Sequence, residues 1–365
     1  MRLGIIGLGA AGLAAALGAA RDGHDVVGFE QSGLDNQEAS SGGRGKVIRF
    51  GYTDPFYADL MRSTMDTWER LAERTSARLM DRNGGLHIGP SEVVDVIEQG
   101  IRKAGRPAER TTDGSAFGIR LDDADQAVYE PDAGVMWPSA VRGALAAEAA
   151  AAGATLRDHV QVEALDETGD GVAVRTGNGV EIFDRLILSG GPWAFRLAPA
   201  AAKSFLVSRR FQLVWGTDGP IGDGLPRPWI DMAGSTVYGM INASSGIHLM
   251  GLHDLDQGQT VTDPDEPDDA DFRATSIERQ AEYVRRRFGI EPRPIDIRVC
   301  HYTMTASEDF VIDDCPGFDR VTLLSPCSGH GFKFSVTTGL YAAAVATGRP
   351  IPDRERFRLQ FATMS

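Results

Sequence analysis

The sequence predicts an α/β protein in which a discontinuous domain with a parallel sheet is joined to an α+β domain with a mostly antiparallel sheet. Three observations support this prediction. Residues 1–29 contain a short apolar run, a glycine turn, an alanine-rich stretch and a second apolar run, which is the order of strand, turn, helix and strand. An apolar run returns at 185–188 and leads into Gly-Gly. Strand-like alternation fills much of 79–137 and 203–298.

The first turn carries three glycines at the spacing of a Rossmann-like dinucleotide-binding unit. Gly7 permits the tight turn, Gly9 lets the backbone approach a pyrophosphate, and Gly12 lets the helix pack closely on the strand. The N-terminus of that helix offers unpaired N–H groups and partial positive charge to phosphates. Glu30, at the end of the second strand, is placed to accept hydrogen bonds from a ribose. Because its charge would repel a 2′-phosphate, the predicted ligand is NAD or FAD. The alternative is a glycine turn that binds no nucleotide.

Length and composition restrict the class of protein. The 365 residues suffice for two domains, and 42% hydrophobic with 24% charged residues is typical of a globular protein. A net charge of -14 argues against nucleic acid as a partner, and the absence of an apolar run of about 20 residues argues against a membrane span. Because the first strand begins at Met1 without room for a signal peptide, we expect a cytoplasmic protein. Three cysteines do not make a disulfide framework.

The remaining elements follow in order along the chain. Helical spacing or helix start and stop signals predict helices over 57–75, 138–152, 276–288 and 336–347. Short segments with turns between them predict a strand-rich stretch at 79–137, and further strands are expected at 155–156, 160–164, 171–176 and 185–188. The acidic run at 263–271 is interpreted as a solvated loop, and no metal site is predicted.

A Ser/Gly-rich loop at 31–45 leads into two cations, Lys46 and Arg49. Three residues apart, they would share one side of a helical turn but face opposite ways on a strand. Surface charge is the ordinary explanation of such a pair. The glycine-rich loop before it favours a functional interpretation, since its backbone N–H groups are free to meet phosphate or ring oxygens.

Six stretches of the chain resemble the monomeric sarcosine oxidase group of FAD-dependent amine oxidoreductases, within the D-amino acid oxidase superfamily. They occur in the family's order from residue 1 to about residue 345, and the last two are specific. The stretches are Gly7–Gly12 with Glu30, Ser40–Arg49 followed by Tyr52, Leu186–Trp193, Tyr238–Gly239, Cys300–Thr303 and Ser328–Phe334.

The resemblance implies FAD as the cofactor and a set of residues around it. The implied contacts are Gly7, Gly9, Ala10, Ala11, Gly12, Glu30, Gln31, Ser41, Lys46, Val160, Gly190, Trp193, Cys300, Gly329, Gly331, Phe332 and Lys333. Cys300 matches the cysteine that carries FAD through a thioether, and a thiolate near cations is a suitable nucleophile for that bond. A buried inert cysteine is the alternative.

By the same resemblance, Arg49 and Lys333 grip the carboxylate of the substrate over the flavin, and Tyr238 and Tyr302 border that pocket. A guanidinium fork and an ammonium together suit an amino acid. Lys46 replaces a second arginine that the family usually has, and it too is a candidate catalytic residue. The Gly329–Lys333 turn should present N–H groups and positive charge to the flavin.

One departure from the family concerns oxygen. His248 stands where the family has the lysine thought to activate O2, and His253 matches a family histidine. A protonated imidazole could stabilise superoxide, whereas a neutral one could not. His248 is therefore a candidate catalytic residue, and the alternative for both histidines is an ordinary hydrogen-bonded strand residue.

Together these observations predict an FAD-binding domain over 1–77, 139–203 and 305–365, and a substrate domain over 78–138 and 204–304. The expected reaction is oxidation of a small amino acid-like amine, secondary or N-methyl or cyclic, to an imine, with O2 as the expected acceptor. The alternatives are an FAD-dependent dehydrogenase with another acceptor, an NAD-dependent dehydrogenase, and a flavin-binding module without turnover.

Overall fold

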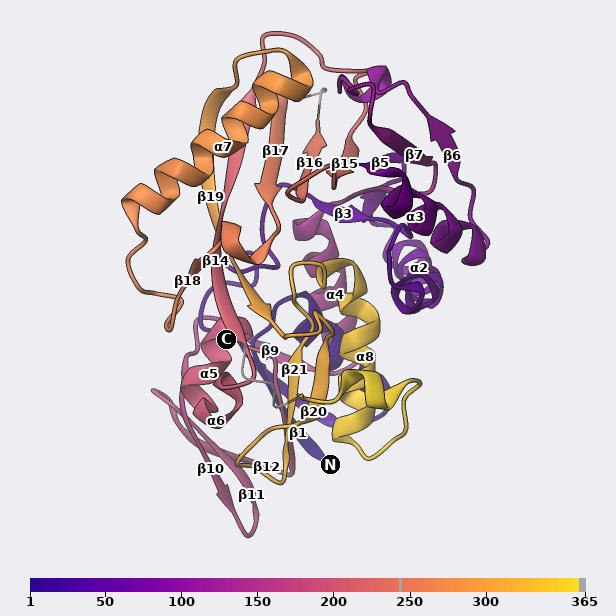
Figure 1. The fold of residues 1–365 in the computed structure, drawn as a ribbon. Helices are drawn as coiled ribbons and strands as arrows, with labels where there is room; N and C mark the ends of the chain where they lie inside the picture. Colours follow the sequence, from indigo (N-terminus) through magenta and orange to yellow (C-terminus); the bar gives the residue numbers. More distant parts are fainter. Residues whose placement is uncertain (243–244, 361–365) are drawn as a thin grey trace.

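The computed structural model describes residues 1–242 and 245–360 and contains two large sheets (Figure 1). The first is a six-stranded sheet in the order β20-β21-β13-β1-β2-β9, in which all neighbours are parallel except β20 and β21. Its strands come from three distant parts of the chain: β1 (Arg2–Ile6), β2 (Asp25–Phe29), β9 (Thr155–Arg157), β13 (Arg185–Leu188), β20 (Val311–Asp314) and β21 (Val321–Ser325). The sheet is therefore interrupted and resumed, as predicted.

Helices pack on this sheet through small residues. The central one, α1 (Ala10–Arg21), lies against α8 (Ser335–Ala346) and α4 (Pro138–Ala151), and α2 (Pro55–Thr75) also packs on α8 and α4. A Cβ added to Gly339 would lie 2.5 Å from the Cβ of Ala14, and one added to Gly18 would lie 2.9 Å from Leu340 Cδ2. The close approach of α1 to α8 thus depends on glycine.

The second large sheet has nine strands and is antiparallel except where β5 pairs with β15. Its path is β18-β14-β17-β16-β15-β5-β7-β6, and β19 pairs along the length of β14. The helix α7 (Ala270–Phe288) packs against β14 and β17, and α3 (Ser91–Lys103) against β5 and β7. The strands are β5 (Gly85–Gly89), β6 (Glu109–Thr111), β7 (Gln126–Glu130), β14 (Leu206–Gly216), β15 (Arg227–Asp231), β16 (Val237–Ile241), β17 (Ile247–Leu252), β18 (Gln259–Thr260) and β19 (Arg293–Met304).

Smaller elements complete the structure. The strands β3 (Lys46–Ile48), β8 (Gly134–Met136) and β4 (Met80–Asp81) form one small sheet, and an antiparallel sheet joins β10 (Val162–Thr168), β11 (Gly171–Thr176) and β12 (Gly179–Phe183). Two short helices, α5 (Ala194–Leu197) and α6 (Pro199–Ala202), follow β13. Among the described residues, no helix is long and apolar enough to cross a membrane.

Three local predictions need correction. The stretch expected to contain only short segments includes the 13-residue helix α3. The helix α7 begins at Ala270 rather than Ser276, because the Asp269 side chain caps it by accepting hydrogen bonds from the N–H groups of Asp271 and Phe272. The acidic run is a loop, as expected, only as far as Asp269, since Ala270 and Asp271 belong to α7; within the loop the exposed acids Asp263 and Asp265 pair with Arg196.

Candidate active site

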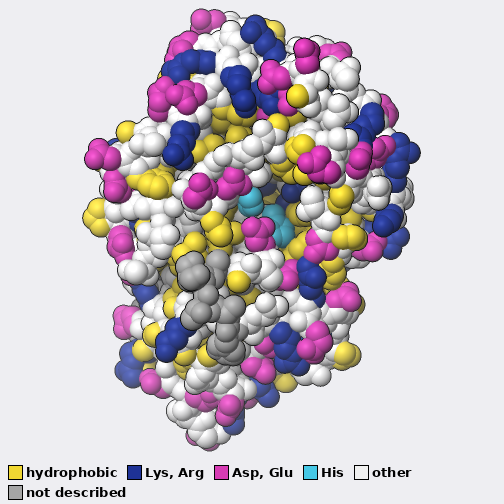
Figure 2. Space-filling model, in the orientation of Figure 1, with side chains coloured by type: hydrophobic (Ala, Val, Ile, Leu, Met, Phe, Trp, Pro, Cys, Tyr) yellow, Lys and Arg dark blue, Asp and Glu magenta, His cyan; other side chains and the backbone are white. Residues whose placement is uncertain are grey.

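A cavity of about 510 Å³ lies between the two large sheets. Its wall combines the first turn of α1, the segment 40–57, strands β16, β17 and β19, and the turn that precedes α8. Figure 2 shows histidine side chains in a hollow near the middle of the face drawn there. The residues that line the cavity thus come from both ends of the chain and from both sheets.

The glycine turn forms one end of the cavity. Gly7 has φ +87°, in the left-handed region, and a Cβ there would lie 2.6 Å from the carbonyl oxygen of Ser189. The helix α1 has no side-chain cap at Gly9, and Ser41 Oγ accepts a hydrogen bond from the Ala10 N–H at 3.0 Å. Glu30 closes the turn, because its carboxylate accepts from Leu8 N at 2.9 Å and Ser32 N at 3.1 Å. The turn has the small residues and the exposed helix start that a diphosphate needs.

The structure brings most of the predicted cofactor residues to the cavity wall. Those that line it are Gly9, Ala10, Ala11, Gly12, Ser41, Lys46, Cys300, Gly329, Gly331, Phe332 and Lys333. The other predicted contacts do not line the cavity: Gly7, Glu30, Gln31, Val160, Gly190 and Trp193. Val160 donates its N–H to the carbonyl of Glu30 at 2.8 Å, and Trp193 Nε1 donates to Asp265 at 2.9 Å.

Two cations from opposite ends of the chain meet at Tyr52. The guanidinium carbon of Arg49 lies 4.1 Å from the centre of the Tyr52 ring, and Lys333 Nζ donates to the Tyr52 hydroxyl at 2.9 Å. Lys333 also donates to the carbonyl of His330 at 2.9 Å. Burial, and then the charge of Arg49, lower the pKa of Lys333 well below its usual value. Within the described ranges neither cation has a carboxylate in an ion pair, so both remain available to an anionic ligand.

Tyr238 and Tyr302 border the same cavity and are joined to each other. The Tyr302 hydroxyl donates to the Tyr238 hydroxyl at 3.0 Å, and Gln212 Nε2 donates to the same oxygen at 2.7 Å. Arg298 Nη1 in turn donates to Gln212 Oε1 at 3.1 Å. Burial raises the pKa of Tyr238 to about 12, so its hydroxyl stays protonated at neutral pH.

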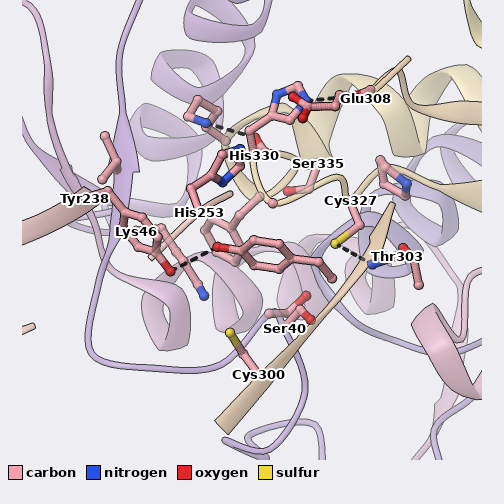
Figure 3. Close-up of a pocket in the computed structure, with 18 of the residues that line it drawn as sticks. Ser40, Lys46, Tyr238, His253, Cys300, Thr303, Glu308, Cys327, His330 and Ser335 are labelled. Carbon is pink, nitrogen blue, oxygen red and sulfur yellow. Dashed lines mark hydrogen bonds between the residues drawn. The ribbon is translucent and has the colours of Figure 1, made fainter. Parts of the chain in front are cut away.

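Cys300 lies on β19 with its side chain at the cavity, on the same side as Lys46 (Figure 3). Burial raises the pKa of the Cys300 thiol, while the charges of Arg298 and Lys46 oppose that rise. Burial and Arg298 lower the pKa of Lys46 to about 7. The cations expected near the thiol are therefore present, although in this structure their effect does not outweigh burial.

The two histidines considered for oxygen chemistry lie in different places. His248 does not line this cavity: its ring packs on Trp215 with centroids 4.6 Å apart, and Nδ1 accepts from the Asn242 N–H at 3.2 Å. It faces a second cavity of about 340 Å³, which shares Met240 and Leu249 with the first. His253 does line the main cavity, and burial lowers its pKa to about 4.

The turn before α8 is shaped by close contacts. Gly329 has φ +76°, and a Cβ there would lie 2.6 Å from the Tyr302 ring and 2.7 Å from the His253 ring. The His330 ring spans the turn, with Nδ1 3.3 Å from the Tyr52 hydroxyl and Nε2 3.0 Å from the carbonyl oxygen of Glu308 (Figure 3). This arrangement fixes Lys333 against Tyr52.

The residues present fit FAD. A Cβ at Gly9 would lie 2.9 Å from Ser41 Oγ, so the wall beside the α1 N-terminus admits only small residues where a diphosphate would lie. The turn at 329–333 and the thiol of Cys300 stand at the other end of the same cavity. FAD, when bound there, would supply the site with a hydride acceptor.

Comparison with known proteins agrees with this fit. Residues 2–345 match the family model described as FAD dependent oxidoreductase. The chain belongs to this family, the D-amino acid oxidase superfamily, and is an FAD-dependent enzyme. It is 24% identical over 361 residues to an N-methyl-L-tryptophan oxidase of Yersinia pestis (strain Pestoides F), covering 95% of each chain.

Solved structures show the same fold. NikD, an amino acid oxidase essential for nikkomycin biosynthesis, has a TM-score of 0.85 at 22% identity, with 98% of this chain and 97% of NikD covered. L-proline dehydrogenase from P. horikoshii has a TM-score of 0.81 at 17% identity, with 98% and 96% covered. The family match and these structures confirm the predicted fold class, an α/β protein with a Rossmann-like FAD domain and a second, mostly antiparallel sheet.

Two residues of the site were not singled out from the sequence. Tyr52 was noted only as part of a motif, yet it contacts both cations. Glu130 was not noted at all, although it binds the backbone beside Arg49. No local pattern in the sequence signals the role of Glu130, which ends a strand that also contains the polar residue Gln126.

Proposed function

We propose that this enzyme oxidises a small amino acid-like amine, secondary or N-methyl or cyclic, to an imine, with O2 as the acceptor. The observation that supports the proposal is the pair Arg49 and Lys333, which meet at Tyr52 inside a cavity shaped for FAD and lack an ion pair within the described ranges. A permanent and a titratable cation at one point suit a carboxylate group. The oxidase and dehydrogenase names of the similar proteins support the same class of substrate.

The protein residues take distinct roles in this proposal. Arg49 and Lys333 bind the carboxylate, and Tyr238 and Tyr302 border the amine. Hydride removal requires a neutral amine, and the cations lower the pKa of a bound amine by repelling its charged form. Carboxylate binding in turn would favour the charged form of Lys333.

We further propose that FAD is attached through Cys300. The thiol lines the cavity beside Lys46, and Ser40 Oγ donates to the carbonyl of the next residue, His301, at 2.5 Å, which fixes the strand. Cys327 also lines the cavity, but its Sγ accepts a hydrogen bond from Thr303 N at 3.4 Å and lies off the motif.

The electron acceptor has two candidates. Oxygen is the first, with the cations at the cavity as the source of positive charge that favours its reduction. Another acceptor, as in a dehydrogenase, is the second, because His248 lies outside the cavity and His253 has a pKa of about 4 and is neutral near pH 7. Because the chain belongs to an FAD-dependent family, the alternative of an NAD-dependent dehydrogenase no longer applies.

The test is reduction of the purified holoenzyme under anaerobic conditions by a panel of N-methyl, cyclic and primary amino acids, each paired with the corresponding amine lacking the carboxylate. We expect an amino acid to bleach the flavin absorption and its decarboxylated partner to fail. Admission of air should then restore the absorption rapidly and yield peroxide. A stable reduced flavin in air would favour the dehydrogenase, and no bleaching by any member would contradict the proposal.

A further inference from the structure

We infer that Glu130 is a positioning residue of the substrate site, which acts through the backbone of Phe50 and Gly51 to hold Arg49 and Tyr52 in place. This inference rests on the proposed function, in which Arg49 binds the carboxylate of the substrate. Glu130 does not line the cavity itself. It belongs to strand β7 of the nine-stranded sheet.

The contacts of Glu130 are unusual for a glutamate. Its side chain has no solvent exposure, and no Arg or Lys forms an ion pair with it within the described ranges. Instead one carboxylate oxygen accepts from Phe50 N at 2.5 Å, and the other accepts from Gly51 N at 3.0 Å. Burying a carboxylate is costly, so these hydrogen bonds and the contact with His87 must offset a large desolvation penalty. The segment that the carboxylate binds indicates what this group does.

The segment that Glu130 binds carries two residues of the substrate site. Phe50 and Gly51 lie between Arg49 and Tyr52, which carry the cation and the ring of the substrate site. The strand β3 ends at Ile48, and among the described residues no strand pairing includes residues 49–52. Two consecutive N–H groups bonded to one carboxylate fix the peptide planes on both sides of Phe50. The direction in which Arg49 and Tyr52 leave the backbone therefore depends on Glu130.

His87 orients Glu130 from the far side. Its Nε2 donates to the same carboxylate oxygen that Gly51 contacts, at 2.7 Å, and its Nδ1 is buried with no hydrogen-bond partner in the part of the chain that the structure describes. A Cβ at Gly51 would lie 2.5 Å from the His87 ring, so the segment rests directly on this histidine. Glu130 and His87 thus form one support, built from neighbouring strands β7 and β5, beneath the Arg49–Tyr52 segment.

The same carboxylate acts on the site through its charge. Glu130 opposes the lowering of the Lys333 pKa by burial and by Arg49. Lys333 donates to the Tyr52 hydroxyl. Loss of Glu130 would therefore disturb the position of Tyr52 and also favour the neutral form of Lys333.

The test compares Glu130→Gln with Asp125→Asn in the holoenzyme. Both replace a buried carboxylate by its amide, Glu130 as the last residue of β7 and Asp125 just before its first residue, but Asp125 binds Arg287, away from the cavity. Dissociation constants for acetate, propionate and benzoate are measured from the flavin absorption, and kcat and KM with the best amino acid substrate. For E130Q we expect at least a tenfold rise in the dissociation constants and in KM, with a smaller fall in kcat. D125N should stay within twofold of the wild type even where its thermal midpoint falls.

A second pair keeps the test decisive if E130Q does not fold. His87→Gln retains an N–H donor for Glu130 and should bind the carboxylates within twofold of the wild type, whereas His87→Leu should weaken binding about threefold or more. Wild-type affinity in E130Q or, where that variant does not fold, in H87L would overturn the inference while leaving the proposed function standing. Equal weakening in D125N would overturn it as well. If the wild type itself bound no carboxylate, the proposed function would fail.

Discussion

Tyr52 is the residue on which the site converges, because Arg49, Lys333 and His330 all contact it. Tyr52→Phe would keep the ring beneath Arg49 but remove the hydroxyl that accepts from Lys333. A hydrogen bond to a charged group contributes about 1.5–3 kcal/mol. We therefore expect KM for an amino acid substrate to rise at least tenfold, measured by steady-state kinetics. Tyr283→Phe, which removes a buried hydroxyl bonded to Asp231 outside the cavity, is the control and should leave KM within twofold. Equal KM values in the two variants would contradict this role.

Cys300 offers a separate test at the residue scale. The wild-type holoenzyme, precipitated with acid and digested, should carry flavin on the peptide that contains Cys300. Cys300→Ser should release its flavin into the supernatant, because a serine hydroxyl is far less nucleophilic than a thiolate. Cys327→Ser, which changes the other thiol that lines the cavity, should retain the flavin. Flavin still bound to the precipitated C300S chain would refute the attachment site.

Residues that belong to motifs could be predicted, and residues that act from a distance could not. Local sequence predicts the glycine turn, and the family resemblance implies roles for Arg49, Tyr302 and Lys333. The structure brings these three residues to one cavity. Glu130 contacts Phe50 and Gly51 from 80 and 79 positions along the chain, and no local pattern reports such a contact. The sequence does not show whether His248 or His253 faces the cavity, because this depends on how β17, which contains His248 and ends just before His253, is placed in the sheet.

At the scale of elements, the contact between α1 and α8 links the nucleotide turn to the turn that carries Lys333. Gly339→Ala would place a methyl group 2.5 Å from the Cβ of Ala14. Overpacking of this kind costs about 1–3 kcal/mol, so the free energy of unfolding should fall by that amount in urea titrations. Because α8 begins at Ser335, two residues after Lys333, we also expect weaker carboxylate binding.

Gly143→Ala in α4 is the matched control for that helix contact. A Cβ at Gly143 would meet no atom within 4 Å, and alanine is the better helix former by about 0.5–1 kcal/mol. This variant should therefore gain stability. A gain in both variants would show that α1 and α8 are not in close contact.

The helices α3 and α7 show why some elements were predicted poorly. The α3 sequence has buried residues at Val94, Ile97 and Ile101, which is helical spacing, but short turn-bounded segments on both sides suggested strands. For α7, the acids before Ser276 were interpreted as a loop because like charges repel. In the structure Asp269 caps the helix and Asp271 lies in its first turn, where the helix dipole favours negative charge.

For the whole molecule, buried histidines predict sensitivity to acid. Burial lowers the pKa of His248, His253 and His301 to about 4, from an ordinary value near 6.5. Between these pH values the unfolded chain binds more protons than the folded one. The contribution of these histidines to the free energy of unfolding is therefore fully present above pH 6.5 and is lost as the pH falls toward 4. Each such group contributes a slope of up to about 1.4 kcal/mol per pH unit.

This pH dependence can be measured with urea titrations at pH 7 and pH 5. The wild type should have a lower free energy of unfolding at pH 5. His248→Asn should lose up to about 2 kcal/mol less between the two pH values, since it no longer has that histidine to protonate. The same loss in H248N as in the wild type would show that His248 does not resist protonation.

The order of strands in the two large sheets has a consequence for how the chain can be divided. The six-stranded sheet takes strands from 2–29, 155–188 and 311–325, and the nine-stranded sheet takes its strands from the intervening stretches. One break in the backbone between residues 29 and 311 therefore leaves the six-stranded sheet assembled from two fragments. Limited proteolysis in that range should yield nicked molecules whose pieces stay together under native conditions, and no contiguous gene fragment encodes all strands of one sheet without strands of the other.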